Sequence, residues 1–329
     1  MIAGRIKGFV KELRKERKRR RRRLTRVHDD WSIGILTGDS PLSLTSPAYV
    51  GNPVLTGADV TDVRAAYVAD PFLLPRAGGE WLLFFEVYNR LREKGEIGAA
   101  RSADGLRWSY ERIVLSEPFH LSYPYVFEWE GEVYLVPESH EAGSVRLYRA
   151  RELPHRWEFV TTLVEGEMLV DPSLFRHEGR WWLLVETNQE PRRWDTLRLF
   201  GADRLEGPWL EHPQSPVVLE PHRARPAGRV IKWQGRPFRF AQVCDPDYGT
   251  AVRAFEILEL SPTAYREREA APGPVLEPGA GWRSTGMHHV DAHRLGDGSW
   301  LACVDGCGKR ASGMEVLHSE DFPWGGTRL

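Results

Sequence analysis

One hairpin-like unit recurs five times along this chain of 329 residues, and this repeat limits the fold more than any other feature. Its clearest copy is residues 170–187, where two apolar, aromatic-rich runs flank a polar tip, a pattern typical of a β-hairpin. With a four-residue loop at the tip, Arg176 pairs with Trp181 and Asp171 lies directly opposite Glu186. Cβ atoms so placed are about 4.5 to 5.5 Å apart. Each copy is therefore predicted to bring its first and last side chains to one end of its hairpin.

The five copies follow one another at a nearly constant spacing. They start at residues 70, 123, 171, 227 and 289, so the intervals are 53, 48, 56 and 62 residues, close to the length of a four-stranded propeller blade. Helical periodicity is absent after residue 30. We therefore predict an all-β, five-bladed β-propeller over residues 31–329, preceded by a basic arm at residues 1–30. An apolar run at residues 31–36 is expected to complete the last blade.

The first and last positions of the copies are mostly acidic. In a propeller the innermost strands line a central channel, so equivalent positions of all blades meet at one mouth. We name this predicted cluster the acidic mouth; it comprises Asp70, Glu86, Glu138, Asp171, Glu186 and Asp305. Crowded carboxyl groups raise each other's pKa values, and such a cost usually marks a functional site. Asp70, Asp171, Glu186 and Glu138 are the candidate catalytic residues, and Glu86, Asp305, Gln242 and Tyr123 are candidate substrate-binding residues.

The fourth copy differs from the others, because arginines stand where acidic or aromatic residues stood before. They are Arg223, Arg225 and Arg229. Their guanidinium groups could simply pair with carboxylates of the acidic mouth. Alternatively, Arg225 and Arg229 form a fork that binds a phosphate or pyrophosphate of the substrate.

The fifth copy contains a histidine cluster. On a β-strand His289, Asp291 and His293 share one face, a spacing compatible with a divalent metal or with acid/base work. The alternative is that one histidine reaches the mouth and the others make structural hydrogen bonds. We place His289 and Asp291 among the substrate-binding residues, assign no metal ligand, and keep a divalent metal as a candidate cofactor.

Charge is unevenly distributed along the chain. Residues 1–26 contain 13 Lys or Arg and two Glu residues, which leaves 32 basic and 44 acidic residues in the remainder. Apolar residues at near-helical spacing in this arm suggest an amphipathic helix on an anionic membrane surface. A solvated tail is an equal alternative. Nucleic-acid binding is less favoured, since no aromatic residues are interleaved with the arginines and the body is acidic.

The cysteine content and the lack of long apolar runs indicate a compartment. Three cysteines are too few and odd in number for a disulfide framework, so we expect buried small residues in a reducing environment. No run approaches the roughly 20 apolar residues of a membrane span, and residues 1–10 lack the apolar core of a secretory signal. The expected location is the cytoplasm, either free or peripheral at the inner membrane face.

Paired carboxyl groups around a polar pocket suit glycosyl chemistry. One carboxylate accepts a proton or attacks the sugar, while another, kept protonated by crowding, donates a proton. Tyr123, Tyr125 and Tyr88 are expected near the mouth, where they would stack on sugar faces.

Two sets of motifs resemble known families. The D-P-F and D-P-S-L-F starts with their W-L-L-F and W-W-L-L ends resemble five-bladed propellers of the arabinanase, levansucrase and invertase type. The run at residues 122–139, followed by V-D-P-S-L-F at residues 170–175, is more similar to the N-terminal domain of glucosamine inositolphosphorylceramide transferases and its bacterial relatives, over roughly residues 31–320. The hydrolase resemblance implies that Asp70 is the catalytic base and Asp171 the transition-state-stabilising aspartate.

The same resemblance places the general-acid glutamate of the hydrolases at the start of the fourth blade, where this chain has Arg225 to Arg229. A phosphate-activated donor needs less help from an acid, because its leaving group departs as an anion. The first hypothesis is therefore a glycosyltransferase-like enzyme of surface glycan or glycolipid assembly. The alternatives are a glycoside hydrolase of furanosides or fructosides, and a non-catalytic carbohydrate-binding propeller.

Overall fold

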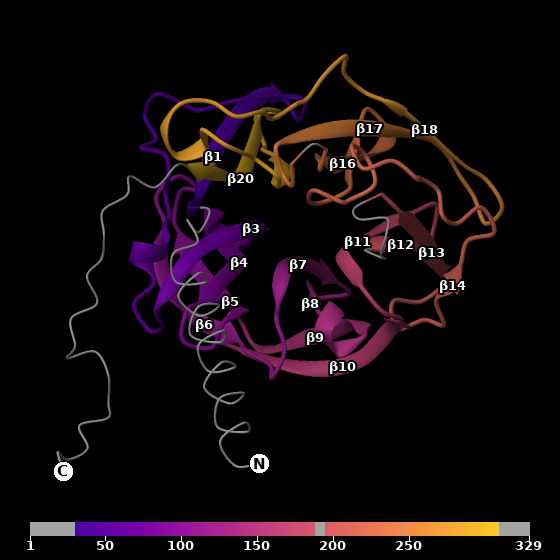
Figure 1. Ribbon diagram of the computed structural model, residues 1–329, viewed down its shortest axis with the longest axis horizontal. Coiled ribbons are helices and arrows are strands. Elements are labelled where there is room, and N and C mark those ends of the chain that lie inside the picture. The colour runs from indigo at the N-terminus through magenta and orange to yellow at the C-terminus, as the bar shows by residue number, and fades with distance from the viewer. Residues whose placement is uncertain (1–29, 188–194, 246, 309–329) are drawn as a thin grey trace, which may run out of the picture. The chain divides into compact units, whose positions relative to one another are not determined.

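The computed structural model describes residues 30–187, 195–245 and 247–308, and within them the chain forms five antiparallel sheets of four strands each. The sheets surround a common centre as propeller blades (Figure 1). Blade 1 is β3 (Ala65–Pro75), β4 (Trp81–Asn89), β5 (Lys94–Ser102) and β6 (Ser109–Leu115). Blade 2 is β7 (Ser122–Trp129), β8 (Glu132–Glu138), β9 (Ser144–Glu152) and β10 (Arg156–Glu165). Blade 3 is β11 (Leu169–His177), β12 (Arg180–Thr187), β13 (Leu197–Ala202) and β14 (Leu210–Glu211).

The remaining two blades complete the predicted five-bladed propeller. Blade 4 is β15 (Ile231–Trp233), β16 (Arg236–Val243), β17 (Ala251–Leu260) and β18 (Tyr265–Glu269). Blade 5 is β19 (Val290–Arg294), β20 (Trp300–Gly308), β1 (Asp30–Ser40) and β2 (Ser43–Thr45). Four three-residue 3₁₀ turns are the helical segments of the described residues: η1 (Gly57–Asp59), η2 (Ala77–Gly79), η3 (His140–Ala142) and η4 (Gly281–Arg283). The basic arm and residues 309–329 lie outside the described residues.

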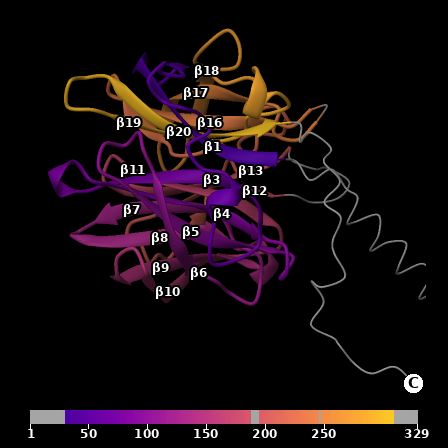
Figure 2. The ribbon, with the colours of Figure 1, turned by 90° about the vertical axis from the view of Figure 1, so that its left-hand side faces the viewer.

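The N-terminal strand closes the ring, as predicted. β1 pairs with β20 from Asp30 opposite Gly308 to Gly38 opposite Trp300, and Figure 2 shows the two strands side by side. Ile33 and Ile35 on β1 are fully buried and pack in one apolar cluster with side chains of blade 1. Strands from the two ends of the described chain therefore share one blade, and apolar burial holds that blade against the next.

Apolar side chains fill the spaces between neighbouring sheets, as the alternating pattern requires. Cys244, Cys303 and Cys307 are buried and free, which agrees with the expectation of small buried residues. In the described ranges, no helix combines the length and the apolar character needed to cross a membrane.

The register of the inner hairpins differs from the prediction at one point. Arg176 does pair with Trp181, but the loop is shorter than four residues, because His177 pairs with Arg180. Val170, not Asp171, lies opposite Glu186, since one extra residue is inserted before the next pair. Asp171 occupies this bulge with a φ of 51°.

The same bulge occurs in blades 1 and 2. Asp70 (φ 52°) and Tyr123 (φ 44°) are the inserted residues, at the positions equivalent to Asp171. A positive φ is unusual for residues with a Cβ, so the surrounding contacts must hold it. These contacts lie at the mouth of the channel.

Candidate functional site

The acidic positions of the repeats meet at one end of the inner strands. Each of the six carboxyl side chains of the acidic mouth belongs to a residue that is between 0% and 6% exposed. They come from β3, β4, β8, β11, β12 and β20, so four of the five blades contribute. The structure therefore gathers the predicted carboxyl groups, whose individual roles stay predictions.

Arg225, which precedes the inner strand of blade 4, lies among three of these carboxylates. Its Nε lies 2.6 Å from Asp171 Oδ2, its Nη1 3.5 Å from Glu186 Oε2 and its Nη2 3.7 Å from Glu138 Oε2. Gln242 Nε2 donates a second hydrogen bond to Asp171 Oδ2, at 2.8 Å. Burial opposes the charge of Arg225, but the surrounding anions outweigh it and raise the pKa of Arg225 well above its ordinary value.

Asp70 forms the second half of the site with Asp305 and His288. Asp305 Oδ2 accepts the Asp70 N–H at 3.1 Å and lies 2.6 Å from His288 Nδ1. His288 Nε2 is 3.6 Å from Asp70 Oδ1, and the Tyr123 N–H donates to Asp70 Oδ2 at 3.3 Å. Burial raises the pKa of Asp70 to about 6, with His288 opposing that shift. The pKa of Asp305 is lowered, because His288 outweighs the effect of burial.

Glu138 is held in its ionised form with the help of His140, a residue that the sequence analysis missed. His140 Nδ1 lies 2.7 Å from Glu138 Oε1, and the Asp171 N–H donates to Glu138 Oε2 at 3.2 Å. Burial opposes ionisation, yet His140 and Arg225 bring the pKa of Glu138 down to about 2. The signal was available, because His140 follows the last position of the second copy by two residues.

Glu86 is also flanked by residues that the sequence analysis missed. Tyr67 Oη donates to Glu86 Oε1 at 3.4 Å, and His120 Nε2 lies 3.6 Å from the same oxygen. Burial raises the pKa of Glu86 well above its ordinary value, and the pKa of Asp171 rises for the same reason against the effect of Arg225. Tyr67 stacks on Tyr88, with ring centroids 5.2 Å apart. No pattern in the repeats pointed to Tyr67 or His120.

Tyr123 does not have the predicted role of a sugar-stacking ring. It is fully buried, and its Oη lies 2.8 Å from Ser173 Oγ and donates to the Gly228 carbonyl at 3.0 Å. The bulge in β7 points its ring into the channel interior, where it meets Phe72 and His289 edge-on. Tyr123 therefore ties blades 2, 3 and 4 together.

Arg229 and Asp291 lie deeper in the channel than predicted. Arg229 Nε is 2.7 Å from Asp291 Oδ1, and its Nη2 donates to the Val126 carbonyl at 2.8 Å. Asp291 Oδ2 accepts the Leu73 N–H at 2.7 Å. Because Arg229 follows Arg225 by four residues along the channel wall, it is removed from the acidic mouth, and the predicted two-arginine fork does not form there.

His289 and His293 lie in different environments. His289 is fully buried, and burial lowers its pKa to about 4, so its ring is neutral at physiological pH. His293 Nε2 lies 3.0 Å from Asp291 Oδ2. The predicted trio of His289, Asp291 and His293 is thus not a set of converging ligands. Among the described residues, Asp70, His288 and Asp305 instead offer one ligand atom each within 4.8 Å of one another, a geometry that a divalent cation could use.

A comparison with known families decides the kinship of this propeller. The family model described as "Glucosamine inositolphosphorylceramide transferase 1, N-terminal" matches residues 26–307. The chain belongs to this family. A glucosamine inositolphosphorylceramide transferase 1 from Oryza sativa subsp. japonica is 36% identical over 304 residues, covering 84% of this chain and 40% of the relative. The Arabidopsis thaliana protein of the same name is 35% identical over 310 residues, covering 88% of the chain and 40% of the relative.

The chain thus spans about 40% of the length of these curated transferases. Solved structures of similar fold include the catalytic domain of a GH62 α-L-arabinofuranosidase from Coprinopsis cinerea, with a TM-score of 0.56, 13% identity, and coverage of 84% of this chain and 96% of that one. A putative glycoside hydrolase from Parabacteroides distasonis has a TM-score of 0.55 at 10% identity, covering 78% of this chain and 95% of that one. At these identities the likeness concerns the propeller fold alone.

Proposed function

We propose that this member of the transferase family is a carbohydrate-active enzyme that transfers a glycosyl unit from a phosphate-activated donor during surface glycan or glycolipid assembly. The names of the curated relatives support a glycosyltransferase-like activity, although they describe proteins of which this chain matches 40%. In the proposal the acidic mouth holds the sugar. The basic arm at residues 1–26 binds the enzyme to an anionic membrane surface from the cytoplasmic side.

The observation that carries the proposal is the wide separation of carboxyl pKa values within one buried network. The pKa of Asp70 is raised to about 6 by burial, so this group can accept a proton near neutral pH. Glu138 stays ionised, with a pKa of about 2. Carboxyl groups with pKa values driven apart are what acid/base work on a glycosyl group requires. Asp70 is the proposed base. Asp171, whose ionised form is favoured by the Arg225 guanidinium 2.6 Å away although burial opposes it, is proposed to stabilise positive charge that develops on the sugar.

The position of Arg225 favours an activated donor over a plain glycoside. A guanidinium whose pKa is raised well above its ordinary value does not protonate a leaving group. A phosphate leaving group needs no proton to depart. The proposal includes no contact between Arg225 and that phosphate, because the guanidinium already lies near Asp171, Glu138 and Glu186.

A glycoside hydrolase is the second candidate, and Glu86 favours it. Its pKa is raised well above the ordinary value by burial, and it lies near Tyr67 and His120 at the mouth. A protonated Glu86 could donate the proton that Arg225 cannot. Hydrolysis of aryl furanosides would identify this alternative.

The test compares the chain with its Asp70→Asn variant on nucleotide sugars, glycosyl phosphates and aryl furanosides. We expect release of phosphate or nucleotide with transfer of the sugar, reduced about 100- to 10,000-fold in the variant, as for loss of a general base. Turnover of furanosides alone would support the hydrolase. Sugar binding without turnover of any donor would contradict both enzymes and leave a carbohydrate-binding propeller. Asp297→Asn, on an exposed turn of blade 5, is the matched control.

A further inference from the structure

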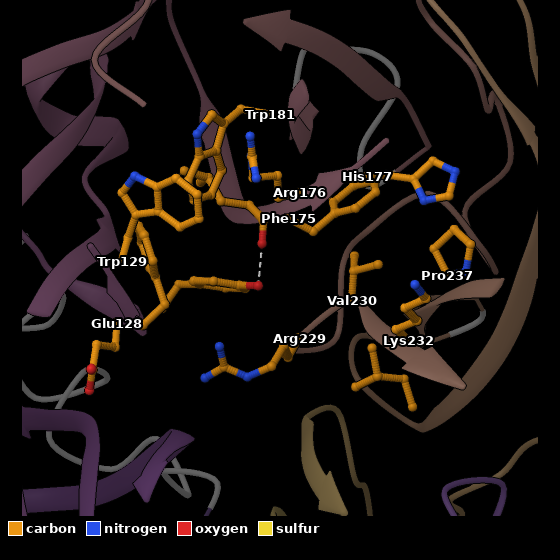
Figure 3. A pocket seen from close by; sticks show the side chains of 14 residues that line it. Glu128, Trp129, Phe175, Arg176, His177, Trp181, Arg229, Val230, Lys232 and Pro237 are labelled. Atoms are coloured by element: carbon orange, nitrogen blue, oxygen red, sulfur yellow. Dashed lines mark hydrogen bonds between the residues drawn. The ribbon is translucent and has the colours of Figure 1, made fainter. Parts of the chain in front are cut away.

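A second cavity lies at the opposite end of the inner strands from the acidic mouth. It has a volume of about 260 Å³ and lies between the hairpin tips of blades 2, 3 and 4; we name it the tip cavity (Figure 3). On β11 the mouth residue Asp171 and the cavity residue Arg176 are five positions apart, which is about 16 Å along a strand. The tip cavity and the acidic mouth are therefore separate sites.

Aromatic side chains form one wall of the tip cavity. Trp129 and Trp181 contact each other with ring centroids 5.1 Å apart, and Phe175 and Tyr125 extend the wall. In Figure 3 the two tryptophans lie together on one side, with His177 and Pro237 on the other. Such a wall offers apolar faces for the C–H groups of a sugar ring.

The charge of the tip cavity is opposite to that of the mouth. Arg176 lies over the Trp129 ring at 4.7 Å, and among the described residues it hydrogen-bonds only the Gly179 carbonyl. Lys232 is exposed and forms no ion pair with a described residue. The carboxylate of Glu128 is 3.0 Å from Arg76, so its charge is already balanced. Arg176 and Lys232 leave the cavity with net positive charge.

Arg229 lines the tip cavity with its charge already balanced. Its Nε and Nη2 bind Asp291 and backbone carbonyls, and its guanidinium lies over the Tyr125 ring at 4.9 Å. The side chain is only 15% exposed. The positive charge available to a ligand in the cavity therefore comes from Arg176 and Lys232.

We infer that the tip cavity is a binding site for an anionic sugar, one that carries a phosphate or carboxylate group. The aromatic wall contacts the ring, and Arg176 and Lys232 attract the anionic group. This site does not depend on the proposed function of the mouth.

Calorimetric titration of the full chain with four probes tests the inference: glucose 1-phosphate, glucuronate, glucose and inorganic phosphate. We expect at least one anionic sugar to bind about tenfold or more tightly than both glucose and phosphate, with affinity that falls as salt rises. Arg176→Ala combined with Lys232→Ala should remove this preference. Both side chains are exposed, so the double variant is expected to fold.

A matched variant locates the binding. Arg107→Ala removes a cation that is 90% exposed on an outer turn of blade 1, and it should leave affinity unchanged. The inference is overturned if neither anionic sugar binds, if phosphate alone binds as tightly, or if the double variant binds normally.

Discussion

Arg225 balances buried carboxylates from two neighbouring blades. Glu138 belongs to blade 2, Asp171 and Glu186 belong to blade 3, and the guanidinium lies within 3.7 Å of all three. Removing water from so many charges costs free energy that a paired cation and hydrogen bonds must offset. At the scale of single residues, the mouth is therefore stable only as a set of matched charges.

Replacing Arg225 by Met should destabilise the propeller by about 3 to 5 kcal/mol, because buried carboxylates lose their cation. Arg101→Met is the control: Arg101 forms exposed ion pairs with Glu80 and Glu111, whose loss should cost less than about 1 kcal/mol. Urea unfolding at pH 7 measures both. Equal destabilisation by the two variants would refute the role of Arg225 as the cation that balances these carboxylates.

The stabilisation by Arg225 should also depend on pH. Arg225 helps to hold the pKa of Glu138 at about 2, so the stabilisation is present above the ordinary carboxyl range and is lost as pH falls toward 2.

The activity of the mouth should depend on the ionisation of Asp70. Burial raises the pKa of Asp70 to about 6, and a base acts only when it is ionised, so the rate of sugar transfer should rise with pH around a midpoint near 6. His288 lowers that pKa through its charge. His288→Gln should consequently move the midpoint to higher pH. A pH–rate profile of kcat/KM, which reports ionisations of the free enzyme, checks both points. An unmoved midpoint in the variant would argue against Asp70 as the titrating group.

At the scale of elements, a repeated bulge joins the blades to the site. Asp70, Tyr123 and Asp171 are inserted residues with positive φ, and the N–H of each donates to a carboxylate of another blade. The acceptors are Asp305, Asp70 and Glu138, each in the preceding blade of the ring. The carboxyl groups of the mouth thus hold neighbouring blades together as well as forming the candidate site.

Gly228, which precedes the inner strand of blade 4, packs closely against blade 5 and gives a test at this scale. Gly228 has a φ of 123°, and a Cβ there would lie 1.8 Å from the Val290 carbonyl oxygen of blade 5. Gly228→Ala should therefore cost more than about 3 kcal/mol, since backbone must move. Gly235→Ala is the matched control in the same blade, with φ of 82° and open space around it. It should cost about 1 to 2 kcal/mol from the backbone conformation alone. Similar unfolding free energies for both variants would contradict this account.

At the scale of the whole molecule, closure of the ring depends on β1. Without this strand blade 5 would end at β20, with an unpaired edge and an uncovered apolar surface. Closing a propeller with strands from both ends of the chain makes every blade depend on every other.

Removing residues 1–45 should abolish cooperative thermal unfolding, because β1 and β2 are lost. A chain without residues 1–26 is the control and should unfold at the same midpoint as the full chain, since every described strand begins at Asp30 or later. Differential scanning calorimetry compares the three proteins. Cooperative unfolding after removal of residues 1–45 would show that the ring closes without β1.

The chain without residues 1–26 also tests the proposed membrane role. We expect it to bind anionic vesicles more weakly than the full chain does.

The amino-acid sequence by itself determined the architecture and the end of the channel at which the acids gather. The constant spacing of the copies and the alternation of apolar residues were enough for five blades, and the apolar run at residues 31–36 was enough for their closure. These features are local and periodic, so they can be read along one chain.

Only the tertiary structure decided how individual side chains are used. One inserted residue in the inner hairpin of blade 3 changed the partner of Glu186 from Asp171 to Val170, because it shifts the register of the two strands by one position. Tyr123 turned inward, and Arg229 reached the tip cavity instead of the acidic mouth. His120 and Tyr67 joined Glu86 from other strands and loops. Such contacts join residues far apart in the chain, and their energies depend on burial and distance, which spacing along a sequence does not encode.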